Sequence, residues 1–164
     1  MNRRHRVVSV LAGAFFLQAA TLNRPAPGFS LKNSRHQQRK LSDFRGDVVL
    51  INFWASWCGP CQQELPELAR LSAEFRSKHV KVLLLNVDSE RASGQRLVSK
   101  LHLSDFPAEV LWDPQSKVAA AYDIPAMPSS FILDTHGSVR YIHSGFHAED
   151  VSLWRQEINQ LLKK

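Results

Sequence analysis

Two long apolar runs dominate the first half of the chain, at 48–54 and 80–87. Runs of this length with few polar positions are typical of strands buried on both faces of a sheet. Between them, over 58–78, apolar residues recur every three or four positions, which predicts an amphipathic helix. Pro66 falls inside this segment and is expected to kink the helix.

Shorter elements surround these runs. The stretches 29–32 and 38–41 can pair as a hairpin before the first buried strand. After the second strand we expect helices over 91–101, 117–122 and 148–162, and strands over 110–112, 129–133 and 139–143. Strands that alternate with helices, followed by a hairpin and a final helix, predict an α/β sandwich around a mixed sheet.

The first 22 residues follow another pattern. Arg3, Arg4 and Arg6 precede an apolar stretch over 7–22, the order found in export signals. As a helix this stretch would span about 24 Å, short of the roughly 30 Å hydrocarbon core. Gln18 lies where cleavage after Ala20 would require a small residue, so a cleaved signal peptide and an uncleaved membrane anchor both stay open. Either would leave the body of the protein outside the cytoplasm, in the periplasm of a bacterium.

Proline and glycine mark the segment 23–28 as a linker. The remaining residues, 29–164, are enough for one domain of ordinary size. The formal net charge of +6 belongs to the front of the chain, because residues 1–42 hold eight Lys or Arg and no acid. The rest holds 13 basic against 15 acidic residues, which argues against a nucleic-acid-binding face.

The two cysteines, Cys58 and Cys61, are separated by two residues. A single pair cannot form a disulfide framework, and a zinc site would require two further ligands at suitable spacing. We therefore expect no metal and no cofactor other than a redox-active Cys58–Cys61 disulfide. The alternative is a passive structural disulfide, but a disulfide that closes so short a loop constrains the unfolded chain little and so stabilises the fold little.

The cysteines stand where a buried strand leads into a helix, so Cys58 should lie at the positive end of the helix dipole. In such settings a thiol pKa near 8.5 falls to roughly 3.5 to 7.5, which yields the reactive thiolate. Gly59 and Pro60 make the first turn tight. We expect Cys58 to be the exposed nucleophile that attacks a substrate disulfide, and Cys61 the partly buried thiol that resolves the mixed disulfide.

The run from Phe53 to Cys61 resembles the thioredoxin active site, and its surroundings are similar to the exported TlpA/ResA-type disulfide reductases. The resemblance extends from Pro27 to the C-terminus. It implies a thioredoxin-like fold: a central mixed β-sheet flanked by helices, with an N-terminal β-hairpin extension. It also implies a cis peptide bond before Pro128. The substrate-binding residues that it implies are Trp57, Gly59, Pro60, Met127, Pro128 and Gly145.

Two departures concern proton handling. Cytoplasmic thioredoxins carry a buried Asp and a Lys at the positions of Asn52 and Leu84. Glu64 instead matches an acid near the active site of TlpA/ResA-type proteins. We expect Glu64 to tune the thiols and relay protons as a third catalytic residue, with a raised pKa if it is partly buried. The alternative is a solvated carboxylate on the helix face.

Other departures concern the branch of the family. The cytochrome-c-maturation branch carries an acid directly after the cis-proline, whereas this chain has Ser129 and Ser130. Peroxiredoxins require Thr and Pro at positions that here hold Ala55 and Ile51. Both features disfavour assignment to those groups.

The resemblance implies a thiol:disulfide oxidoreductase that reduces disulfides of exported proteins, in cytochrome c maturation or a related process. A membrane thiol donor of the DsbD or CcdA type would recharge it, since cytoplasmic reductants do not reach that compartment. We expect a monomer. The alternatives are an oxidant that inserts disulfides, a client-binding module without turnover, and a thiol peroxidase; the Gly59-Pro60 dipeptide favours reduction.

Overall fold

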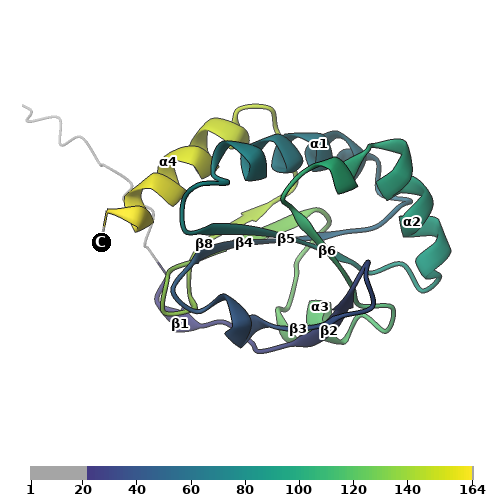
Figure 1. Ribbon diagram of the computed structural model, residues 1–164, viewed down its shortest axis with the longest axis horizontal. Coiled ribbons are helices and arrows are strands. Elements are labelled where there is room, and N and C mark those ends of the chain that lie inside the picture. Colours follow the sequence, from purple (N-terminus) through teal and green to yellow (C-terminus); the bar gives the residue numbers. More distant parts are fainter. Residues whose placement is uncertain (1–21, 164) are drawn as a thin grey trace, which may run out of the picture.

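A mixed eight-stranded sheet runs through the part of the chain that the computed structural model describes, residues 22–163 (Figure 1). Its strand order is β1-β8-β7-β4-β5-β6-β2-β3. The strands are β1 (Arg24–Pro25), β2 (Ser30–Asn33), β3 (Gln38–Lys40), β4 (Val48–Trp54), β5 (Val80–Asn86), β6 (Glu109–Trp112), β7 (Ser129–Leu133) and β8 (Ser138–Ser144). The predicted α/β sandwich around a mixed sheet, with an N-terminal β-hairpin, is confirmed.

Strand β4 lies at the centre, parallel to β5 and antiparallel to β7. All seven of its residues are buried, as the run with Asn52 as its one polar position predicts. Strand β6 continues the parallel part of the sheet beyond β5, and β8 pairs with β7 in antiparallel fashion. The carboxyl ends of the three parallel strands therefore meet at one edge.

Three helices cover one face of the sheet: α1 (Gly59–Glu74), α2 (Arg91–Lys100) and α4 (Asp150–Leu162) (Figure 1). The opposite face carries α3 (Lys117–Ala121), and short 3-10 turns occur at η1 (Leu41–Phe44) and η2 (Leu103–Asp105). Helix α1 passes through Pro66 but ends at Glu74, earlier than expected. It ends there because residues 75–79 turn the chain back and place Val80 beside Val48.

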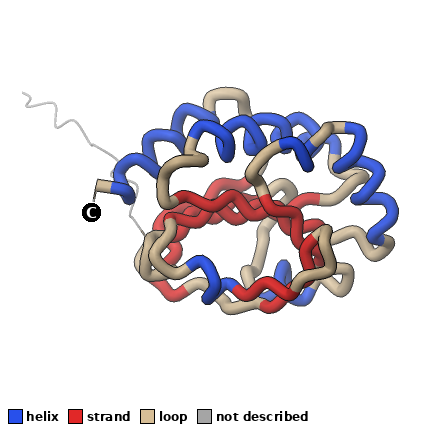
Figure 2. The backbone as a smooth tube through the Cα atoms, in the orientation of Figure 1, coloured by secondary structure: helices blue, strands red, loops and turns tan. Residues whose placement is uncertain are grey.

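The strands at both ends of the sheet curl toward the face that carries α3 (Figure 2). Two apolar cores result. One lies between the sheet and α1, α2 and α4, with Trp54, Leu68 and Trp154 at its centre. The other is enclosed by the curled sheet and α3, and contains Phe53 and Phe131.

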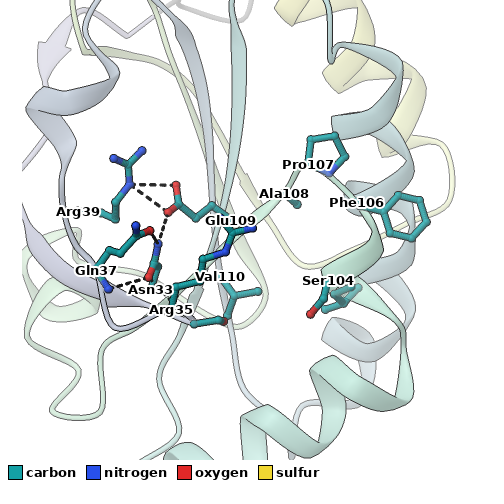
Figure 3. A pocket seen from close by; sticks show the side chains of 12 residues that line it. Asn33, Arg35, Gln37, Arg39, Ser104, Phe106, Pro107, Ala108, Glu109 and Val110 are labelled. Atoms are coloured by element: carbon teal, nitrogen blue, oxygen red, sulfur yellow. Dashed lines mark hydrogen bonds and ion pairs between the residues drawn. The ribbon is translucent and has the colours of Figure 1, made fainter.

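The hairpin β2–β3 joins the main sheet because β2 pairs with β6. A polar network fastens this junction beside a cleft (Figure 3). The Asn33 amide donates to the Glu109 carboxylate over 2.8 Å, and Arg39 donates to the same carboxylate over 3.0 Å. The Asn33 side-chain oxygen accepts the backbone N–H groups of Arg35 and Gln37, which closes the hairpin turn.

Part of the expected linker 23–28 is ordered as an edge strand. Arg24 and Pro25 pair with Val139 and Ser138 of β8. A sheet edge tolerates proline because one side of the strand has no neighbour that requires its N–H. The predicted signal or anchor lies outside the described residues, except for Leu22; among the helices of residues 22–163, none is long and apolar enough to span a membrane.

Candidate active site

The cysteine pair lies at the edge where β4 ends and α1 begins. Cys58 is the N-cap residue of α1, Pro60 lies in the first helical turn, and the two sulfur atoms form a disulfide. The Cys61 N–H points at the Cys58 sulfur over 3.3 Å. Cys58 retains 5% of its surface and Cys61 none. Cys58, which was expected to be exposed, is thus largely buried in this oxidised form, in which its sulfur is bonded to the fully buried sulfur of Cys61.

An aspartate that sequence reasoning missed holds the loop before the cysteines. The buried Asp88 carboxylate accepts the Ser56 N–H over 3.1 Å and the Ser56 hydroxyl over 3.0 Å. The Asn86 amide donates to Asp88 in turn, over 2.8 Å. The position of Asp88, shortly after the buried strand β5, could have indicated a place in the site, because parallel strands end at the same edge of a sheet.

The loop before β7 forms the other side of the site. Its Met127–Pro128 peptide bond is cis, as predicted. Pairing of Ser129 with Phe53 places this loop beside the end of β4. Gly145 has φ +80° and donates its N–H to the Pro128 carbonyl over 2.8 Å. A side chain at Gly145 would meet open space, so here the backbone conformation is what favours glycine.

A groove of about 520 Å³ runs from the active-site loop to α3. Trp57, with 71% of its surface exposed, stands at one end. Val87 and Met127 line the groove together with residues of the α3 segment, among them Ala120 and Ile124. The groove is therefore mainly apolar, and its residue Trp57 directly precedes Cys58 in the chain.

The Glu64 side chain, on the active-site helix α1, is fully buried. The alternative interpretation of Glu64 as a solvated carboxylate is therefore wrong. It accepts a hydrogen bond from the Asn52 amide over 2.8 Å and a longer one, 3.4 Å, from the Ser130 hydroxyl. Burial raises the pKa of Glu64 from 4.5 to about 8, against the lowering effect of these two donors. The Glu64 carboxyl can therefore exchange a proton close to neutral pH.

Of the predicted site residues, the cysteines and the Met127–Pro128 loop lie near the end of β4, and Glu64 lies one turn beyond Cys61 on α1. His143 of β8 pairs with Glu157 of α4 over 2.7 Å. Within residues 22–163 there is no group of three or more His, Cys, Asp or Glu side chains that could hold a metal ion. Ser130, noted in the sequence only as a departure, is with Asp88 an addition that the structure makes to the site.

Comparison with known proteins gives consistent matches. Residues 22–142 match the AhpC/TSA family. Thiol-disulfide oxidoreductase ResA of Geobacillus kaustophilus is 32% identical over 127 residues, which cover 77% of this chain and 71% of that protein. Thioredoxin-like protein YneN of Bacillus subtilis is 35% identical over 120 residues, 73% of this chain and 69% of that one.

Solved structures agree with these sequence matches. A crystal structure assigned as the thiol:disulfide interchange protein DsbE of Chlorobium tepidum superposes with a TM-score of 0.79. The two sequences are 33% identical, and the superposition covers 86% of this chain and 97% of that one. A thiol-disulfide oxidoreductase of Bacteroides fragilis has a TM-score of 0.72 at 28% identity, over 82% of this chain and 99% of that one.

The raised pKa of Glu64 predicts a pH-dependent stability. An acid that binds its proton more tightly when folded stabilises the fold fully below pH 4.5, and this stabilisation is lost as pH rises to about 8. Glu64→Gln should remove that loss, at most about 1.4 kcal/mol per pH unit for one proton. Urea unfolding of both oxidised proteins at pH 5, 7 and 9 measures it; parallel profiles would contradict the assignment.

Proposed function

Because this chain belongs to the AhpC/TSA family and is a thiol-disulfide oxidoreductase of the TlpA/ResA type, we propose that it reduces disulfides of exported proteins through Cys58 and Cys61. The observation that carries the proposal is the cysteine pair at the start of α1, beside the loop of Pro128. Reduced protein enters the cycle, and the disulfide seen here is the form that leaves it.

The cycle balances without an added cofactor. The Cys58 thiolate attacks one sulfur of the client disulfide, and the other client sulfur leaves as a thiolate that takes up a proton. Cys61 then loses its proton and attacks the Cys58 sulfur, which releases the second client thiol. Two electrons pass from the protein to the client, and Cys58–Cys61 becomes a disulfide.

The positions of the two cysteines support the roles proposed for them. Cys58 precedes the first turn of α1, where free backbone N–H groups and the helix dipole stabilise a thiolate. Cys61 is buried one turn further along and can be reached only by the sulfur next to it. Attack on a large client therefore belongs to Cys58 and resolution to Cys61.

Glu64 is the proposed proton carrier for Cys61. The two residues are three positions apart on α1, and residues at this spacing are neighbours on a helix surface. A carboxyl with a pKa of about 8 can give up or accept a proton near neutral pH. The strand positions that manage this proton in cytoplasmic thioredoxins hold Asn52 and Leu84, so here the acid comes from the helix.

The groove beside the cysteines is the proposed client site. Exposed Trp57 and partly buried Met127 offer apolar contact, while Gly59 and Pro60 leave little side chain in front of Cys58. A client backbone would lie along Pro128, close to Gly145. Such a surface fits an extended, partly apolar segment around a client cysteine.

The proposed setting follows from the N-terminal segment. Residues 1–22 would direct export or anchor the protein, 23–28 would link, and 29–164 would act outside the cytoplasm as a monomer. A membrane thiol donor of the DsbD or CcdA type would reduce the disulfide again. Clients would be exported cysteine proteins, with apocytochrome c as one member; the serines at 129 and 130 favour this wider class over the cytochrome branch alone.

Removal of the resolving thiol should trap clients. In Cys61→Ser, the mixed disulfide on Cys58 cannot be resolved, so covalent complexes should accumulate in the cell envelope. They can be collected on non-reducing gels and identified by mass spectrometry. Cys58→Ser is the matched control and should trap none. Equal trapping by both variants would refute the assigned roles.

The direction of electron flow predicts the reduction potential. A reductase should equilibrate with glutathione or thioredoxin at about −250 mV or lower. Disulfide content after equilibration in defined redox buffers, read by thiol alkylation, measures it. A value near about −120 mV would instead assign the protein as a disulfide-forming oxidant.

Loss of the Glu64 proton carrier should slow turnover. Glu64→Gln keeps the buried shape but cannot exchange a proton, and general acid–base groups contribute about a hundredfold or more to rate. Reduction of a model disulfide by the prereduced protein at pH 7 measures the effect. Glu67→Gln, one turn further along α1 and partly exposed, is the control and should be unchanged. An unaltered Glu64→Gln rate would disprove the role.

A further inference from the structure

Three polar side chains from distant parts of the chain meet beneath the active-site helix: Asn52 of β4, Glu64 of α1 and Ser130 of β7. Each has at most 1% of its surface exposed. The Asn52 amide nitrogen donates to Glu64 over 2.8 Å and to Ser130 Oγ over 3.0 Å. Ser130 Oγ lies 3.4 Å from the second Glu64 oxygen. The carboxyl thus faces two donors and no other polar partner within residues 22–163.

This arrangement suits an ionised Glu64, since a carboxylate only accepts hydrogen bonds. It leaves one atom unsatisfied. Asn52 Oδ1 is buried and has no hydrogen-bond partner among the described residues. A buried acceptor without a donor is unfavourable, so the unused oxygen of an amide whose nitrogen bonds to an acid requires an explanation.

A protonated Glu64 reverses the requirement. Its O–H must find an acceptor, and the candidate acceptors in the cluster are Ser130 Oγ and the unsatisfied Asn52 Oδ1. Half a turn about the last side-chain bond of Asn52 exchanges the positions of Oδ1 and Nδ2. The oxygen would then accept the Glu64 proton over the same short distance, and the Ser130 hydroxyl could donate to it as well.

We propose that Asn52 is a positioning residue whose amide turns over each time Glu64 gains or loses its proton, with Ser130 as the shared hydroxyl. The inference rests on the proposed function of Glu64. When the proton passes from Glu64 to the Cys61 thiolate, one O–H bond breaks and one S–H bond forms, without transfer of electrons. The amide then presents Nδ2 to the new carboxylate, so Glu64 stays buried in both states.

An amide can serve both states, and neither an aspartate nor an apolar residue can. Aspartate at position 52 would present a second carboxylate to Glu64, and alanine would present nothing. Both the Asn52 and the Ser130 hydrogen bond lower the pKa of Glu64, so loss of either donor should raise it further.

Other ionisable groups surround the cluster. Asp150, in the first turn of α4, raises the pKa of Glu64 through its charge. Cys61 lies one turn away on α1. On β8, His143 pairs across the sheet with Ser130, and its ring contacts Glu157 of α4. On the β5 side, Asn52 is in register with the apolar Leu84. A titration must therefore be assigned to Glu64 by substitution.

The experiment follows the wild-type protein by NMR from pH 5 to 10, in the oxidised form. The Glu64 carboxyl carbon, assigned by its loss in Glu64→Gln, gives the titration midpoint. The Asn52 side-chain N–H signals should shift with the same midpoint, and in Glu64→Gln they should not titrate there. Asn52 signals that stay constant while Glu64 titrates would overturn the proposal, and this test requires no destabilised variant.

Substitutions supply the second arm. Asn52→Asp and Ser130→Ala should each raise the Glu64 midpoint, Asn52→Asp by about one pH unit or more because like charges oppose ionisation. Ser72→Ala is the control, because it removes another buried hydroxyl whose bond stays within α1, to Ala69. Unchanged midpoints in Asn52→Asp and Ser130→Ala would count against the cluster.

The two proposals can fail separately. If Glu64→Gln leaves disulfide exchange unchanged while the Asn52 amide follows the Glu64 titration, the proton-carrier role fails and the coupling of the amide stands. If exchange falls in Glu64→Gln but the Asn52 signals remain constant, the carrier role stands and the turning amide is refuted.

Discussion

The complete burial of β4 is the constraint on which the site depends. With β5 on one side, β7 on the other and a core on each face, this strand has no freedom to shift in register or direction. Its end at Trp54 therefore fixes where the chain leaves the sheet, and α1 must begin a few residues later. The cysteine pair inherits its position from this geometry, and Asp88, after the neighbouring parallel strand, holds the loop between them.

Because β4 is fully buried, a polar residue inside it must find its hydrogen-bond partners within the protein. Asn52 is a polar side chain in a strand otherwise composed of apolar residues, and it faces the helix that carries the cysteines. Buried polar groups require partners, and those of Asn52 come from α1 and β7. The acid of the cluster stands on the helix, one turn from Cys61, and the neutral amide stands on the strand. Proton handling in this protein is thus coupled to the hydrogen bonds that pack the helix on the sheet.

The active site and the β2–β3 hairpin lie in different parts of the sheet. At the carboxyl edge of the parallel strands lie the buried disulfide and the Met127–Pro128 loop, and Trp57 and Met127 line an apolar groove. At the far side, the β2–β3 hairpin extends the sheet and is fixed by the Asn33, Arg39 and Glu109 network (Figure 3). In this network the charges of Arg39 and Glu109 pair with each other. This pairing fits a structural role, that of holding the hairpin over the core on the α3 side of the sheet. Chemistry and fold support are therefore separated in space.

The sequence by itself determined most of the strands and helices, the cysteine pair and its place at a helix start. These are local features, because hydrophobic periodicity and a contiguous motif are written in neighbouring residues. Only the tertiary structure decided that Glu64 is buried, that Ser130 and Asn52 bond to it, and that Arg24 and Pro25 form an edge strand. Asn52 and Ser130 are 78 positions apart, so their contact depends on the register of two strands that no local pattern specifies.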